Sequence, residues 1–337
     1  MNRPARLRRL TVLAIGVSTA ISLTACGSSG SEADGGSATP KASAPAPEGI
    51  VDQKTASSVV DAYEKANNKA NATRDAELLG TVEAGQVHEQ SKADYTHWPT
   101  WTKKRQKTYS TPFYYRDRQF WIPAASSGAT WFAVTARSAK EPKDPGGLLI
   151  FDKVGGRYKM TAGVALDAKP KISVDEHGLA APADPSKKVG TLAPDEIGER
   201  YEDFFETGGK EAKQVFASTE DTRESTKVFT ERNAGESGRW STTKYEVAKP
   251  AHPAVYALRL VGGGVLSVFP TAHTESQVLK PAYLYNSKIT PGPDARVYNP
   301  TPRIAIINDY QGQGLAELQP QKKVRVTELE YRITGSE

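Results

Sequence analysis

The sequence has little of the chemistry that marks common enzyme families. It contains a single cysteine, which excludes an internal disulfide and any zinc site built from cysteine pairs. Its five histidines are scattered and form no His-Glu-x-x-His motif. A Gly-x-Ser-x-Gly nucleophile elbow and a Gly-x-x-x-x-Gly-Lys-Ser/Thr phosphate loop are also missing. From these absences we expect no metal site, no cofactor and no catalytic residues.

A long hydrophobic run is missing as well, since a stable membrane span needs roughly 20 apolar residues. The mostly apolar run at residues 10–23 is shorter, and four arginines with no acidic residue precede it. This order is typical of an export signal. The run ends in Leu23-Thr24-Ala25-Cys26, which resembles the lipobox of bacterial lipoproteins, where the cysteine receives a diacylglyceryl group and the bond before it is cut. The resemblance implies that residues 1–25 are a signal peptide and that Cys26 is lipidated.

The segment after the signal predicts where the folded part sits. From the cysteine onward, residues 26–49 are rich in glycine, serine, alanine and proline, so we interpret them as a flexible tether. As a random coil, this tether would span roughly 25–30 Å. We therefore expect a protein held at the cell membrane by its lipid anchor, on the extracytoplasmic face.

An excess of charge of one sign is absent once the leader is removed. The whole sequence has a formal net charge of +5, but four of its 44 basic residues lie in the leader, which leaves 40 against 39 acidic residues. A nucleic-acid-binding domain normally has a strongly basic balance. We therefore expect no nucleic acid among the partners.

The remaining chain is long enough for two domains. Apolar residues at helical spacing open each half, with Val60 and Tyr63 in the first and Tyr201 in the second. The pair Tyr63-Glu64 recurs at Tyr201-Glu202, which favours an internal duplication. We predict a first domain at 50–180, a linker at 181–192 and a second domain at 193–337.

Segments typical of strands follow each helical start, because they are rich in aromatic and β-branched residues. Gly155-Gly156 predicts a two-residue hairpin between two of them, and three glycines at 262–264 predict another turn. Gly312 and Gly314 begin a dinucleotide-binding pattern but lack its third glycine, so we interpret them as a loop turn. The predicted strands are 111–124, 130–138, 147–154, 157–166, 254–261, 265–270, 302–309 and 322–334.

A helix followed by an antiparallel meander predicts an α+β fold with two tandem domains, each an N-terminal helix packed on a curved antiparallel sheet. The order is similar to the cone-shaped nuclear-transport-factor-2-like and cystatin-like architectures, and "YEKANNKANATRDAELLG" at 63–80 resembles the opening of transport-factor-like domains. The whole chain also resembles uncharacterised lipoproteins of Gram-positive bacteria. The resemblance implies no substrate, because enzymes of that class use a His, Asp or Tyr in the cone while many relatives only bind ligands or partners.

Aromatic residues crowd the segment 98–132. Adjacent pairs such as Phe120-Trp121 place one ring on each face of a strand, so some aromatic surface is expected away from the helix. Residues 103–107 form a basic cluster on an expected loop. Two alternatives need no binding role: the rings would form a domain core and a domain interface, and the charges would lie on a solvated loop. The candidate binding residues are Trp98, Trp101, Tyr114, Trp121, Trp131, Lys103, Lys104 and Arg105.

Two functions of different classes are consistent with these features, besides a purely structural role in a lipoprotein complex. In the first, a non-catalytic binding module stacks its aromatic surface on a sugar or partner protein while the basic cluster approaches anionic headgroups or wall polymer. In the second, the first cone encloses a small ligand and performs acid/base chemistry through His97 with Asp94. We predict the first, an envelope binding protein without enzymatic activity, whose partner is an envelope protein or wall polymer.

Overall fold

The first helix begins where the carboxylate of Asp52 accepts a hydrogen bond from the backbone N–H of Thr55 at 2.6 Å. Helix α1 (Gln53–Thr73) ends at Arg74, whose left-handed backbone with φ 58° turns the chain. The structure is a computed structural model that describes residues 46–139 and 145–337. The predicted signal peptide, Cys26 and most of the predicted tether therefore lie outside the described residues.

The first half places four helices before a four-stranded antiparallel sheet of order β1-β2-β3-β4. The turn between β3 and β4 is made by Gly155 and Gly156, with φ 60° and 80°, so the predicted hairpin is confirmed. The helices are α1, α2 (Ala76–Gly80), α3 (Gly85–His97) and α4 (Lys103–Ser110), and the strands are β1 (Tyr115–Trp121), β2 (Trp131–Ser138), β3 (Gly147–Val154) and β4 (Arg157–Ala165).

The second half builds a longer antiparallel sheet of order β5-β7-β8-β9, and β6 pairs with β7 as well. β5 and β6 share one edge of β7, because β8 pairs along the whole of the other edge. The helices are α5 (Ile197–Glu206), α6 (Ala212–Val215), α7 (Glu220–Glu231), α8 (Ser237–Trp240) and α9 (Pro293–Arg296), and the strands are β5 (Ser241–Val247), β6 (Tyr256–Arg259), β7 (Val265–Leu279), β8 (Ala305–Leu318) and β9 (Arg325–Ser336).

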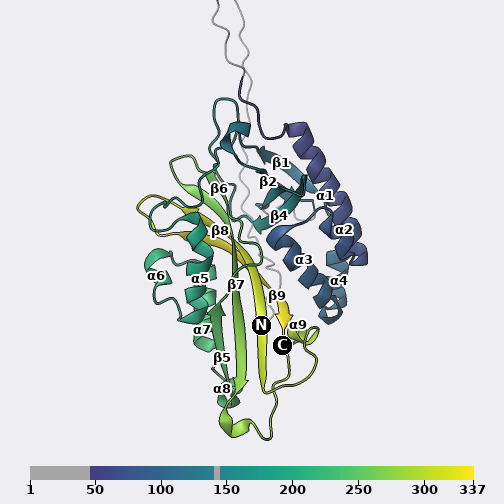
Figure 1. The fold of residues 1–337 in the computed structure, drawn as a ribbon, viewed down its shortest axis with the longest axis vertical. Helices are drawn as coiled ribbons and strands as arrows, with labels where there is room; N and C mark the ends of the chain where they lie inside the picture. The colour runs from purple at the N-terminus through teal and green to yellow at the C-terminus, as the bar shows by residue number, and fades with distance from the viewer. Residues whose placement is uncertain (1–45, 140–144) are drawn as a thin grey trace, which may run out of the picture. The chain divides into compact units, whose positions relative to one another are not determined.

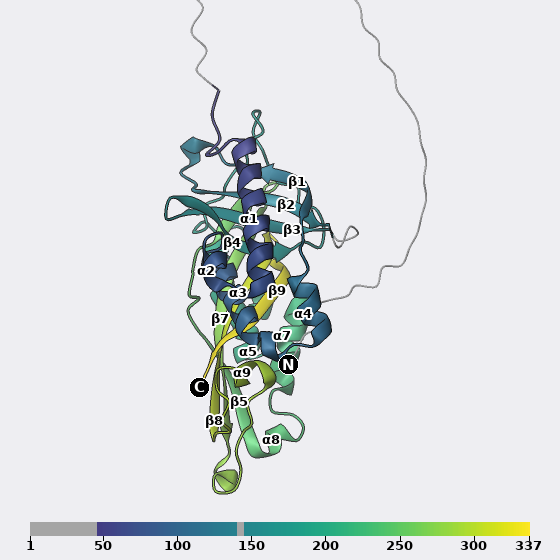
Figure 2. The same cartoon turned by 90° about the vertical axis from the view of Figure 1, so that its right-hand side faces the viewer.

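Helices cover one face of each sheet. Figure 2 shows α1 lying across the strands β1 to β3, and Figure 1 shows α5 and α7 beside β5 and β7. Helix α3 has a different place, because it contacts β4 of the first sheet and also β8 and β9 of the second. The helix that carries His97 therefore also contributes to joining the two halves.

The first sheet is buried on both faces. Its helix-facing side packs with α1 through a core that includes Val60, Tyr63 and Phe151. Its other side packs against the second sheet, in a core that draws Leu148 and Ile150 from β3 together with Leu266 from β7. A separate core under α5 fills the second half. The two halves therefore share apolar contacts that two independent domains would not have.

The α+β class and the two antiparallel sheets agree with the prediction from the sequence. The tandem cone arrangement and the boundaries 50–180, 181–192 and 193–337 stay predictions. Two local predictions were wrong: β7 continues past residue 270, and Gly312 and Gly314 lie inside β8. A Cβ at Gly312 would lie 2.5 Å from Tyr331, and one at Gly314 would lie 2.5 Å from Phe269, so both positions need glycine because an aromatic ring crosses the strand.

Within the two described segments, no helix combines the length and the apolar character that a membrane crossing requires.

Candidate functional site

Aromatic and basic side chains gather where α3 passes through a short 3-10 turn into α4. The rings of Trp98, Trp101 and Tyr109 contact one another, with centroids between 5.1 and 6.1 Å apart. Four exposed basic residues follow on the first turns of α4. We call this group the aromatic–basic corner; its members are Trp98, Trp101, Lys103, Lys104, Arg105, Lys107 and Tyr109.

The basic residues of the corner form a helix, so the prediction of a loop was wrong. Thr102 caps α4 by accepting a hydrogen bond from the N–H of Arg105 at 3.2 Å, and Lys, Arg and Gln are good helix formers. The charges nevertheless oppose the helix dipole, since its first turn holds basic residues and no acidic one. Among the described residues, Lys103, Lys104 and Lys107 have no ion-pair partner.

The tryptophan rings of the corner lie beneath arginines. The guanidinium of Arg105 lies over Trp101, 3.7 Å from the ring centroid, and that of Arg74 lies over Trp98 at 4.7 Å. Trp101 is only 7% exposed, and its indole N–H is buried without a hydrogen-bond partner. The ring of Trp101 is therefore not open for stacking on a sugar, which corrects the expectation for this residue, and the exposed groups beside it are cationic. Stacking by the half-buried Trp98 or by Tyr114 stays a prediction.

The other predicted aromatic residues lie away from this corner. Trp121 is buried between the two sheets, where its indole N–H donates to Thr135 at 3.2 Å. Trp131 packs edge-on against Tyr256 of the second sheet at 5.4 Å. Tyr114 is 53% exposed. The sheet face opposite α1, which the sequence analysis expected to present aromatic surface, is covered by the second sheet, so Trp121 and Trp131 belong to a core.

The pair considered for acid/base chemistry, His97 and Asp94, lies at the contact between α3 and the second half. Asp94 accepts a hydrogen bond from Arg332 at 2.7 Å; burial raises the pKa of this carboxyl, and Arg332 partly opposes the rise. His97 is 2% exposed and packs edge-on against Tyr298, and burial lowers the pKa of its imidazole. In this position both side chains attach α3 to the second half.

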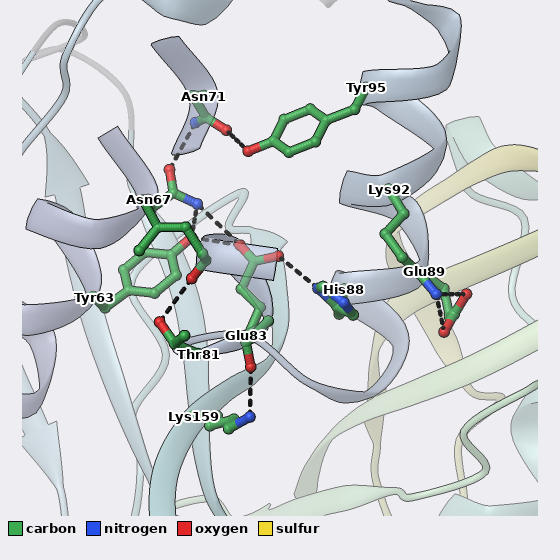
Figure 3. Close-up of polar contacts among 12 residues, drawn as sticks. Tyr63, Asn67, Asn71, Thr81, Glu83, His88, Glu89, Lys92, Tyr95 and Lys159 are labelled. Atoms are coloured by element: carbon green, nitrogen blue, oxygen red, sulfur yellow. Dashed lines mark hydrogen bonds and ion pairs between the residues drawn. The ribbon is translucent and has the colours of Figure 1, made fainter. Parts of the chain in front are cut away.

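A buried polar network lies under α1, and Figure 3 shows side chains from α1, from α3 and from the segment before α3 converging there. Glu83, just before α3, is 2% exposed, and its Oε1 accepts hydrogen bonds from the phenol of Tyr63 and the amide of Asn67, both at 3.0 Å. Asn67 also accepts from Asn71, which in turn accepts from Tyr95, both at 2.7 Å. Burial, and then Glu83, raise the pKa of Tyr63, so its phenol remains a donor.

The second oxygen of Glu83 has no such partner. Oε2 is buried and accepts no hydrogen bond within the described part of the chain. It lies 3.9 Å from Nδ1 of His88, and that nitrogen is buried and unpartnered too (Figure 3). This distance is too long for a hydrogen bond, and it is too short for a water molecule to lie between the two atoms. A buried polar atom left unsatisfied costs about 1–3 kcal/mol, which packing alone does not explain.

His88 also lines a cavity of about 550 Å³ between α2, α3 and the β3–β4 hairpin. Two further basic residues line it, Arg157 and Lys159, together with the acidic Glu77. Lys159 donates a hydrogen bond to the carbonyl of Gly80 at 2.5 Å. Arg157 is exposed and has no partner among the described residues. The cavity is therefore lined by basic side chains, and the buried carboxylate of Glu83 lies next to one of them, His88.

A second buried carboxylate, Glu202 of α5, is fully paired. Its Oε1 accepts hydrogen bonds from Thr271 and, at 2.6 Å, from Tyr331, and its Oε2 lies 2.8 Å from Nδ1 of His273. These contacts attach α5 to β7 and β9. Within residues 46–139 and 145–337, no buried polar side-chain atom of this cluster lacks a hydrogen-bond partner, so the cluster has a sufficient structural explanation, in contrast to Glu83.

Sequence reasoning missed the roles of Glu83 and His88. The available signal was Glu83 itself, a charged residue in the mostly apolar stretch 78–87, since a charge in such a segment is rarely buried without a partner. Tyr63 precedes these two residues in the sequence and Arg157 follows them, and only the fold brings the four side chains into one region. The spacing of the residues therefore formed no motif.

Comparison with known proteins places the chain in a family. An uncharacterized lipoprotein of Streptomyces coelicolor is 29% identical over 318 residues, which cover 91% of this chain and 88% of that protein. No solved structure matches the chain significantly. A family model described as Domain of unknown function (DUF8094) matches residues 47–337, which span nearly all of the described residues. The chain therefore belongs to the DUF8094 family.

Proposed function

We propose that this protein is a membrane-anchored lipoprotein of the extracytoplasmic face that binds an anionic surface of the cell envelope without catalysing a reaction. The similar Streptomyces protein is named a lipoprotein, and the Leu-Thr-Ala-Cys sequence at Cys26 supports the same anchor here. The aromatic–basic corner supplies the binding surface.

The observation that carries this proposal is the placement of the cations of α4. Lys103, Lys104 and Arg105 occupy the first turn, where positive charge destabilises a helix by about 0.3–1 kcal/mol each at low salt. Stability alone would favour acidic residues there. The first turn of α4 therefore departs from the usual preference for acidic residues, and no described ion pair compensates its lysines. This departure points to an interaction that requires the positive charge.

The rings beneath the arginines give the corner its rigidity. Stacking on Trp101 limits the conformations of Arg105, and Trp98 does the same for Arg74. A guanidinium held over an indole loses less entropy when it meets an anion than a freely rotating one does. Trp98 and Trp101 therefore act as supports for the cations, and direct stacking on a sugar is not part of the proposal.

Anionic lipid headgroups are the proposed target, because a lipid anchor on a tether of roughly 25–30 Å would keep the folded body close to them. Each lysine or arginine near an anionic membrane contributes about 1 kcal/mol to association. The corner would then orient a body that the tether alone leaves free to rotate. Wall polymer is the alternative, and the experiment below separates the two.

The test uses residues 46–337, which form one compact unit, so that the anchor makes no contribution. Flotation with vesicles of phosphatidylglycerol and phosphatidylcholine should recover the protein at low salt and release it at high salt, since salt screens exposed charges. Vesicles of phosphatidylcholine alone should recover none. Binding to purified wall polymer but not to anionic vesicles would move the target to the polymer. Binding to neither would refute the proposal.

A further inference from the structure

We propose that the cavity beside His88 is a separate binding site for an anionic oxygen group, a phosphate or a carboxylate, of a small polar ligand. Its volume of about 550 Å³ is within the usual range for small-molecule sites, roughly 300–1,000 Å³. The site is independent of the aromatic–basic corner and shares no residue with it.

Two basic side chains supply the first interactions. Arg157 opens strand β4 next to the hairpin glycines, and its guanidinium can engage two oxygens of one anion. Lys159 lies two residues further along the same strand, so both side chains are on the same face of the sheet. The hydrogen bond from Lys159 to the Gly80 carbonyl holds the ammonium at the wall of the cavity and leaves two of its protons for a ligand.

His88 supplies the third interaction, and Glu83 positions it. The unpaired Oε2 of Glu83 faces Nδ1 of His88, so a proton carried on that nitrogen would point toward the carboxylate. The side chain of His88 is 19% exposed, and its opposite edge lies next to Gly80 at the cavity. An imidazole that carries a proton on each nitrogen can donate to Glu83 through Nδ1 and to an anion in the cavity through Nε2, so anion binding would be coupled to uptake of a second ring proton. A ligand would therefore close the 3.9 Å gap and satisfy the buried oxygen.

Glu77 restricts the ligand. Its carboxylate lines the same cavity as the three basic groups, so a second anionic group on the ligand would be repelled. A hydroxyl can instead donate a hydrogen bond to it. The site therefore suits a ligand with one anionic group and neighbouring hydroxyls.

Calorimetric titration of the full-length protein in detergent tests this site, with sodium phosphate and sodium acetate as separate probes at constant ionic strength. Saturable binding of phosphate or of acetate supports the proposal and identifies the group preferred. Arg157→Gln should weaken that binding by about tenfold or more, because a charge-assisted pair is lost. Lys153→Gln is the matched control: it removes one charge from the same hairpin but lies outside the cavity lining, and should leave the affinity unchanged.

Gly80→Ala tests the His88 edge without removing a charge. The added methyl would lie 3.6 Å from Nε2 of His88, an ordinary contact that the fold accepts, and should weaken binding by covering the imidazole. Glu83→Gln should weaken binding while the hydrogen bonds to Tyr63 and Asn67 persist. Saturable binding of neither probe would overturn the proposal, as would an equal loss in Lys153→Gln. Substitution of Lys103 and Lys104 should not change this affinity, so failure here and failure of vesicle binding are distinguishable.

Discussion

Replacing Lys103 and Lys104 with glutamine should affect binding and stability in opposite directions. Two charges lost near an anionic membrane remove about 2 kcal/mol of association, or roughly a 30-fold loss of affinity. The same change relieves the unfavourable placement of the two charges at the start of α4, which is worth about 0.5 kcal/mol in total for exposed groups in salt. Flotation with phosphatidylglycerol vesicles measures the first effect, and urea unfolding of residues 46–337 measures the second.

The matched control is Lys187→Gln with Lys188→Gln. These lysines are also adjacent and exposed, and they lie outside the corner and outside any helix. The control should reduce vesicle binding less than twofold if the corner, rather than net charge, is responsible. Equal losses in the two double variants would refute the reasoning. So would a fall of more than about 1 kcal/mol in the unfolding free energy of the corner variant, since the lysines would then stabilise α4.

Three further substitutions test the fold. Gly314→Ala should lower the free energy of unfolding by about 1–3 kcal/mol, because its Cβ would lie 2.5 Å from the ring of Phe269; urea unfolding measures the change. Trp121→Ala should cost about 3–5 kcal/mol, since the indole fills the core between the sheets, and a loss below 1 kcal/mol would contradict that placement. Partial burial raises the pKa of Asp203, but its hydrogen bonds, of which that from the N–H of Ala212 has the largest effect, lower the pKa by more. The pKa of this carboxyl is therefore below its usual value of 3.8. Asp203→Ala should therefore lower the free energy of unfolding by about 1 kcal/mol at neutral pH. Thermal unfolding at several pH values should show that the difference between variant and original protein becomes smaller as the pH falls below about 4.

Sequence patterns correctly predicted those turns and helices that depend only on residues close together in the sequence. The turn at Gly155 and Gly156 needs only two positive φ angles, and the helix at Ile197 needs only its apolar spacing. Pro270 was interpreted as the end of a strand, yet β7 continues through it. The reason is tertiary: Pro270 lies between the parts of β7 that pair with β6 and with β5, where that edge of the strand has no partner to lose.

The candidate sites show the same division between local and tertiary causes. The basic run at 103–107 was visible, but its helix depends on the cap at Thr102, and its cationic surface depends on arginines that cover the rings. The faces of Phe120 and Trp121 were assigned correctly as opposite, with Phe120 toward the α1 core. What covered the second face could not be known, because the sheet that buries Trp121 is formed more than 100 residues later.

Strand β9 has a consequence for how the two halves fold. It contributes Val326 and Leu329 to the core under α5, and its Arg332 attaches to Asp94 of α3. Before β9 is in place, both halves lack contacts that complete them. The two halves are therefore expected to reach their native packing together, in one cooperative step. Loss of β9 alone would expose the core under α5 and release α3 from the second sheet.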